Sequence, residues 1–152
     1  MNELDYKNLA IQSFNDTWNY IDKTDRNEID IEKMIRLAHS SKHYWVKAKG
    51  TAINMERGDW LISHVYAIIG NGDEALKFAK LCLNRVLNED IKDFDLVFGY
   101  EAMARAFNVL GNKEETKTYL DLGYKAIDGV EKEDDRKYCI SQLDSIYKKS
   151  TE

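Results

Sequence analysis

The segment Ile62-Ser63-His64-Val65-Tyr66-Ala67-Ile68-Ile69-Gly70-Asn71-Gly72-Asp73-Glu74 has a counterpart 41 residues later, Met103-Ala104-Arg105-Ala106-Phe107-Asn108-Val109-Leu110-Gly111-Asn112-Lys113-Glu114-Glu115. Both copies place a large aliphatic residue before a small one, an aromatic residue three positions after the small one, and then a glycine-centred turn. Gly58 and Gly99 coincide under the same shift. Self-similarity at a fixed period is typical of repeat architectures. The segment therefore predicts two helical hairpins of the same design.

The order of residues in these hairpins resembles the tetratricopeptide repeat over residues 56–128, about half of the chain. The pattern continues beyond the turn with a small residue early in the second helix and another late in it. The first hairpin supplies Ile62, Ser63, Tyr66, Gly70, Ala75 and Cys82, and the second supplies Met103, Ala104, Phe107, Gly111, Thr116 and Gly123. The resemblance implies an all-α fold of antiparallel helical hairpins, stacked as a short right-handed superhelix. The spacing is longer than the 34 residues usual for this repeat, and the proline that closes it is absent.

Four short runs further resemble uncharacterised bacterial helical-repeat proteins, a likeness that implies no activity. These runs are Ala38-His39-Ser40, His43-Tyr44-Trp45, Arg57-Gly58-Asp59-Trp60 and Asp93-Phe94-Asp95-Leu96.

Helices are expected along the whole chain, because it contains no proline and shows no sustained alternation of the kind strands require. Turn-forming stretches separate seven predicted helices, at residues 3–22, 28–48, 54–69, 73–87, 94–110, 113–127 and 132–148. We expect a single domain over residues 1–152. It consists of a divergent first hairpin (1–50), two repeat hairpins (54–87 and 94–128) and a capping helix (132–148). Short connections make successive helices antiparallel neighbours.

The composition argues against several classes of function. A net charge of −5 is unfavourable for a nucleic-acid partner, which needs clustered Lys and Arg. No apolar stretch is long enough to span a membrane, and the N-terminus has no signal-peptide pattern. Cys82 and Cys139 belong to no CxxC pair, so we expect a cytoplasmic protein with reduced thiols.

The resemblance to the tetratricopeptide repeat also implies a binding groove along the first helix of each hairpin. The groove residues that it implies are Arg57, Trp60 and His64 from one helix and Phe98, Glu101, Arg105 and Asn108 from the next. This set suits a protein or peptide segment, because arginine pairs with carboxylates in two-pronged fashion. In the alternative interpretation, Glu101 and Arg105 pair on an exposed face and the two aromatic residues belong to the core.

Three other features have both a structural and a functional interpretation. Gly58 and Gly99 lie inside predicted helices, where glycine is costly, so close helix packing is the expected reason. Asp93 and Asp95 flank a helix start, and capping is favoured over acid–base chemistry. If they do not cap the helix, the two carboxylates are candidates for general acid–base catalysis.

His39, His43 and His64 are the only histidines, and they are the candidate ligands for zinc if helices bring the three rings together. The sequence between the first two lacks the glutamate of an HExxH motif.

We therefore expect an interaction module without catalysis, cofactor or resident metal. The partner would be a protein or peptide segment. The first alternative is a self-associating homodimer. The second is an enzyme or metal-dependent binder that uses the three histidines.

Overall fold

The computed structural model describes residues 1–151, which form seven α-helices, one short 3-10 turn and no strand. The helices are α1 (Glu3–Ile21), α2 (Glu28–Lys47), α3 (Ala52–Ile68), α4 (Gly72–Asn88), α5 (Phe94–Val109), α6 (Lys113–Ala126) and α7 (Glu133–Ser150), with the 3-10 turn at Ile127–Gly129. Each predicted helix is present, and its ends lie within two residues of the prediction. The all-α fold class is confirmed.

Local capping chemistry explains where the helices begin. The side-chain oxygens of Asn2, Asn27 and Thr51 accept a hydrogen bond from the backbone N–H of the third residue of α1, α2 and α3. The side chain of that third residue in turn accepts a hydrogen bond from the backbone N–H of the capping residue. Such reciprocal caps satisfy two amides that a helix start otherwise leaves without partners. α3 and α5 end before Gly70 and Gly111, whose φ angles of +85° and +78° favour glycine.

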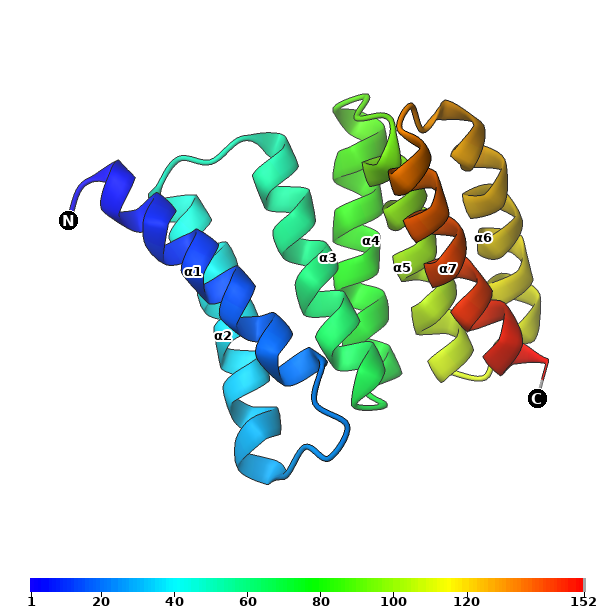
Figure 1. Ribbon diagram of the computed structural model, residues 1–152, viewed down its shortest axis with the longest axis horizontal. Coiled ribbons are helices and arrows are strands. Elements are labelled where there is room, and N and C mark those ends of the chain that lie inside the picture. Colours follow the sequence, from blue (N-terminus) through cyan, green and yellow to red (C-terminus); the bar gives the residue numbers. More distant parts are fainter. Residues whose placement is uncertain (152) are drawn as a thin grey trace.

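The helices form a row of antiparallel hairpins, with α1 and α2 at one end and α6 and α7 at the other (Figure 1). The backbones of α1, α3, α5 and α7 approach one another in succession, whereas those of α2, α4 and α6 lie further apart. The side chains of α2 still reach α4, since the rings of His39 and Phe78 are 5.5 Å apart. The odd-numbered helices therefore make up one continuous face of the stack. The two chain ends lie at opposite ends of the row (Figure 1).

Equivalent positions of the two repeat hairpins are buried alike, as the internal repeat predicts. Small residues fill the interface within each hairpin, at equivalent positions. Ser63 of the first hairpin corresponds to Ala104 of the second, Ala75 corresponds to Thr116, and Cys82 corresponds to Gly123. The glycines inside α3 and α5 also have a packing role. A Cβ atom on Gly99 would lie 3.1 Å from Leu83 Cδ1, and one on Gly58 would lie 3.3 Å from Lys42 Cβ. The predicted close packing of helices at Gly58 and Gly99 is confirmed.

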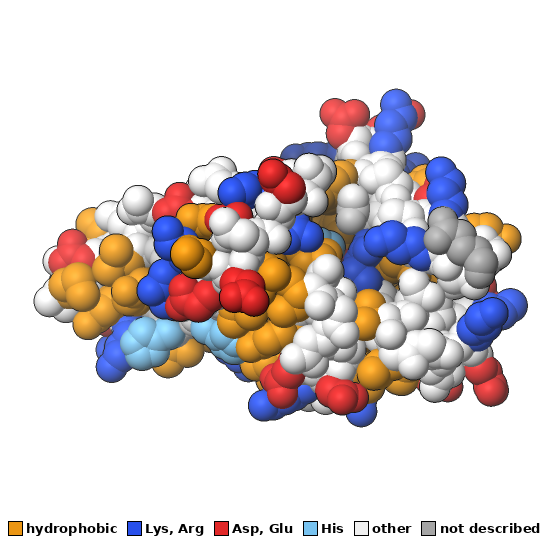
Figure 2. Space-filling model, turned by 90° about the horizontal axis from the view of Figure 1, so that it is seen from below, with side chains coloured by type: hydrophobic (Ala, Val, Ile, Leu, Met, Phe, Trp, Pro, Cys, Tyr) orange, Lys and Arg blue, Asp and Glu red, His pale blue; other side chains and the backbone are white. Residues whose placement is uncertain are grey.

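The outer surface is mixed in charge. In the view from below, Lys and Arg side chains are interspersed with Asp and Glu around exposed hydrophobic groups (Figure 2). Within the described residues, no helix has the length and apolar character needed to cross a membrane.

Candidate functional site: an aromatic groove between α1 and α3

Three adjoining hollows follow α1 where it lies against α3. The inner hollow has a volume of about 190 Å³, and its walls come from all four odd-numbered helices: Phe14, Trp18, Glu56, Arg57, Trp60, Phe94, Asp95, Phe98 and Tyr138. The middle hollow, of about 150 Å³, is lined by Ile11, Phe14, Asn15, Trp45, Asn54 and Arg57. The outer hollow, of about 320 Å³, is lined by Glu3, Leu4, Lys7, Trp45, Ala48, Lys49, Gly50, Thr51 and Asn54.

Neighbouring hollows share their walls. Phe14 and Arg57 line both the inner and the middle hollow, while Trp45 and Asn54 line both the middle and the outer one. The three hollows therefore adjoin one another in a row, which we call the α1–α3 groove. All three tryptophans of the chain lie along it.

Aromatic rings form most of the inner hollow. Trp18 of α1 stacks against Trp60 of α3 with ring centroids 6.0 Å apart. Trp60 meets the edge of Phe98 of α5 at 5.6 Å, and Phe98 is 5.8 Å from Tyr138 of α7. These contacts connect four helices through side chains alone. Large amphipathic rings held in this way give a rigid apolar surface at low entropic cost.

One end of the inner hollow carries a charged pair. The guanidinium of Arg57 donates from Nε and from Nη2 to the two carboxylate oxygens of Asp95, at 2.9 Å in both cases. The same guanidinium lies over the ring of Phe94, 5.0 Å from its centroid. Two-pronged pairing of this kind fixes the orientation of both groups. Arg57 is thus partly exposed at the edge of the groove, with its charge already balanced by Asp95.

Beside this pair lies Glu56, which is only 2% exposed. Its Oε2 atom has no hydrogen-bond partner. Burial, followed by a hydrogen bond to Asp95, raises the pKa of Glu56 from 4.5 to about 9. Near neutral pH the side chain is therefore a carboxylic acid beside Asp95.

A second buried network supports the aromatic wall from behind. Glu101 is fully buried and accepts from Trp60 Nε1 at 2.7 Å and from Arg105 Nε at 2.6 Å. Arg105 also donates to Ser145 Oγ of α7 at 3.2 Å. The predicted residues Glu101 and Arg105 thus fix the indole of Trp60 and tie α5 to α7.

The alternative interpretation of the sequence pairs Glu101 with Arg105 on an exposed face. The pair is present, but the prediction that it is exposed is wrong. Their side chains are 1% and 11% exposed. The indole ring of Trp60 and the helix α7 cover the carboxylate of Glu101.

His64 is buried behind the aromatic wall. Its ring stacks on Trp60 with centroids 4.8 Å apart and lies 5.9 Å from Trp18. Its Nδ1 atom has no hydrogen-bond partner. Burial lowers the pKa of His64 from 6.5 to about 4, so the ring is neutral in the folded protein.

This burial makes the folded state sensitive to acid. The unfolded chain binds a proton at His64 below about pH 6.5, whereas the folded chain does so only near pH 4, so stability is full above pH 6.5 and falls as the pH drops. We expect this residue to cost about 2 kcal/mol of stability between pH 7 and pH 4.5. Denaturant unfolding at both pH values, compared with His64→Gln, checks this. An equal loss in the variant would contradict it.

Of the seven residues predicted for the groove, three line the inner hollow and four do not. Arg57, Trp60 and Phe98 line the inner hollow. His64, Glu101, Arg105 and Asn108 are not among the residues that line the three hollows, and the first three of these support the wall from behind.

The three histidines do not meet. His39 Nε2 lies 2.9 Å from the Tyr66 hydroxyl, His43 is exposed, and His64 is buried among aromatic rings. Within residues 1–151 no three His, Cys, Asp or Glu side chains are placed to hold a metal ion. Asp93 caps α5 by accepting the amide of Phe94 at 2.7 Å, as expected.

Several groove residues were not predicted to belong to the site. Phe14 and Trp18 of α1 and Trp45 of α2 carry no motif, and helical periodicity alone places them on the apolar faces of their helices. On α1 it is instead the small residues Ala10, Ser13 and Thr17 that are buried. Glu56 was not singled out at all. A signal existed, since the 41-residue shift aligns Glu56 with Val97, a fully buried apolar residue. A carboxyl group at such a position is expected to be buried.

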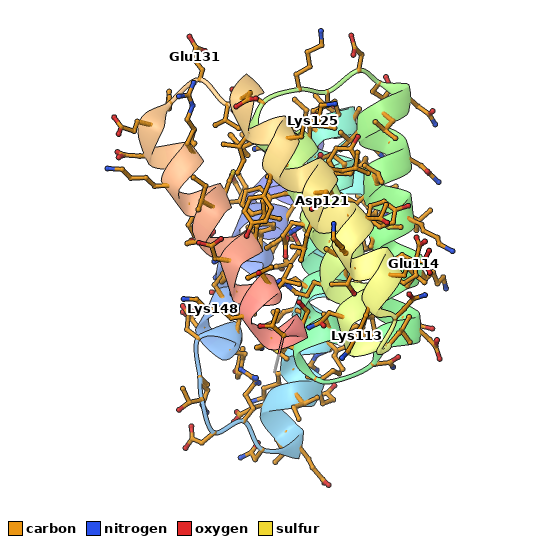
Figure 3. The ribbon with its side chains drawn as sticks, turned by 90° about the vertical axis from the view of Figure 1, so that its right-hand side faces the viewer. Lys113, Glu114, Asp121, Lys125, Glu131 and Lys148 are labelled. Atoms are coloured by element: carbon orange, nitrogen blue, oxygen red, sulfur yellow. The ribbon has the colours of Figure 1, made fainter. Side chains whose placement is uncertain are left out.

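The end of the stack formed by α6 and α7 has a different character. Its labelled side chains, Lys113, Glu114, Asp121, Lys125, Glu131 and Lys148, are charged and exposed (Figure 3). The same two helices also expose the apolar side chains Leu122, Ile140 and Tyr147.

No protein-family model matches this chain, and comparisons with curated proteins and with solved structures give no significant match. The site is therefore interpreted from its own geometry.

Proposed function

We propose that this chain is a tetratricopeptide-like interaction module that binds a segment of a protein partner in the α1–α3 groove. The observation that carries the proposal is the row of three adjoining hollows, which share Phe14, Arg57, Trp45 and Asn54 as lining residues. A line of adjoining hollows suits a linear peptide better than a compact small molecule, whose pocket is a single cavity of about 300–1,000 Å³.

The residues along the groove support the same proposal. Tryptophan, tyrosine and arginine are the residue types that contribute most to binding at protein interfaces. Here Trp18, Trp60 and Tyr138 surround the inner hollow, and Arg57 stands at its edge. The aromatic rings are held by α1, α3, α5 and α7 before any partner arrives. A surface organised in advance loses little entropy on binding.

The groove can be tested with a matched pair of variants. Ile11 lines the middle hollow and is 40% exposed, while Leu81 on α4 is 42% exposed and lines none of the three hollows. A charge at either exposed position is tolerated by the fold. Ile11→Asp puts a carboxylate in the groove, so we expect peptides bound there to lose affinity by about tenfold or more. Leu81→Asp is expected to leave binding unchanged.

The measurement is selection of a random 12-residue peptide library on the wild-type protein, followed by titration of the selected peptides against both variants. Tryptophan fluorescence reports occupancy, because Trp18, Trp45 and Trp60 all line the groove. Selected peptides that bind Ile11→Asp as well as wild type, or a library that yields no binder, would contradict the proposed function.

A further inference from the structure

The inner hollow combines aromatic faces with one unpaired acceptor. Trp18, Trp60, Phe98 and Tyr138 form a connected arc of rings, each within 6.0 Å of the next. The face of an aromatic ring carries negative electrostatic potential and attracts a cation held within about 6 Å of its centroid. A hollow lined by several such rings is more than an apolar slot, because a cation held among them is attracted by the ring faces that it meets.

The polar end of the hollow also favours a positively charged group. Both oxygens of Asp95 are engaged by Arg57, so this carboxylate offers no free two-pronged site. Glu56 lines the same hollow, is 2% exposed, and has no partner for its Oε2 atom. Buried polar atoms almost always have a hydrogen-bond partner in folded proteins. A buried acceptor without a partner, on a side chain that lines a hollow, favours a ligand that carries a hydrogen-bond donor.

Charge balance selects the kind of donor. Arg57 and Asp95 neutralise each other, and an uncharged Glu56 leaves the empty hollow without net charge. An anion entering it would meet two carboxyl groups and no free cation. A neutral aliphatic chain would leave the Glu56 oxygen unpaired. An ammonium or guanidinium group would supply the missing N–H donor, contact the ring faces, and be balanced once Glu56 releases its proton.

We propose that the inner hollow is a specificity pocket for a basic side chain, lysine or arginine, on the segment that occupies the α1–α3 groove. The proposal rests on the proposed function and adds the chemistry of the ligand. The aliphatic stem of the side chain lies against Phe14 and Trp18, and the charged nitrogen lies against Glu56 between the rings. A volume of about 190 Å³ accommodates one such side chain and little more.

Binding of the cation is coupled to the release of a proton by Glu56. Charged or titratable groups face this carboxyl group from α3, α5, α7 and α4, namely Arg57, Asp59, Asp95, Tyr138 and Cys82. On α1 the lining residues Phe14 and Trp18 are uncharged, and Lys42 of α2 is paired with Asp59. Glu56 is the one among them whose pKa, about 9, makes it give up a proton to a cation near neutral pH. The affinity for a cation therefore rises between about pH 6 and pH 8.5.

The test compares N-acetyl-lysine amide with N-acetyl-norleucine amide, which has a similar aliphatic stem and no ammonium group. Titrations follow the indole NMR resonances of Trp18 and Trp60, with Trp45 as an internal control in the next hollow. We expect the lysine probe to shift both inner indoles with an affinity about tenfold higher than that of norleucine, and to bind more tightly at the higher pH.

Two variants separate the contributions. Glu56→Gln keeps the shape of the side chain and removes its charge, so it should reduce lysine binding to the norleucine level and abolish the pH dependence. Trp18→Leu keeps an apolar wall without a ring face, and should weaken the lysine probe more than norleucine. Glu89→Gln, an exposed position on the turn after α4, should change neither.

Equal affinity of the two probes, or an effect on neither inner indole, would overturn the basic-side-chain pocket. Tighter binding of N-acetyl-glutamate amide would overturn it as well. These results leave the peptide selection above untouched, because that experiment depends on Ile11 in the middle hollow and on no particular side-chain chemistry.

Discussion

Arg105→Ala is expected to lower the free energy of unfolding by about 3–5 kcal/mol, the range found when one partner of a buried ion pair is removed. The change leaves the carboxylate of Glu101, which is fully buried, with only the indole N–H of Trp60 as partner. It also removes the donor to Ser145 that joins α5 to α7. Since small proteins are stable by about 5–15 kcal/mol, this loss takes a large share of the total.

Urea unfolding followed by circular dichroism measures the effect. Lys117→Ala is the matched control, because Lys117 and Asp121 have the same spacing on a helix but are both exposed. We expect that control to unfold at the same urea concentration as the wild type. If Arg105→Ala also unfolded there, the buried network around Glu101 would not exist as described. Arg105 lies behind Trp60 and holds the aromatic wall of the inner hollow in place. Its replacement is therefore unsuitable for testing partner binding, because it would change stability and the groove together.

Glu56→Gln is expected to stabilise the protein increasingly as the pH rises. The folded-state pKa of Glu56 is about 9 against 4.5 for the unfolded chain, so its contribution to stability is fully present below pH 4.5 and is lost as the pH approaches 9. The wild type should therefore lose about 2–4 kcal/mol between pH 5 and pH 8 through this residue alone. Glutamine cannot ionise and retains an N–H donor for Asp95.

The measurement is the difference in unfolding free energy between Glu56→Gln and wild type at pH 5, 6.5 and 8. A difference that grows in favour of the variant supports a protonated Glu56 beside Asp95. A difference that stays constant with pH would show that Glu56 is ionised in the folded state, and the charge balance of the inner hollow would then be wrong. His64 acts at the acidic end and does not affect this comparison, since both proteins contain it.

The helices of this protein are predictable because their signals are local. Asn2, Asn27 and Thr51 cap helices within their own turn, and Gly70 and Gly111 end helices by adopting positive φ. The internal repeat adds the pairing of helices, because small residues recur wherever two helices approach. None of these signals depends on which distant side chains meet.

The site is less predictable because its residues are defined by contacts across the stack. Apolar periodicity marks Phe14 and Trp18 as inward-facing, but it does not show that α1 leaves a groove in front of α3 instead of closing over it. The spacing of Glu101 and Arg105 predicts their pairing, while their burial depends on α7. Glu56 is buried because residues of α1, α5 and α7 surround it, and the one sequence signal for that burial is its alignment with Val97 in the internal repeat.

The most direct test of the groove as a binding surface is site-specific photo-crosslinking in the cells that produce this protein. A photoreactive amino acid replaces Asn15, which is exposed and lines the middle hollow, or Asn84, which is exposed on α4 and lines none of the three hollows. The proposal predicts one or a few defined protein adducts from position 15 that are absent from position 84 and disappear in the Ile11→Asp background. Identical adducts from both positions, or none from position 15, would contradict it.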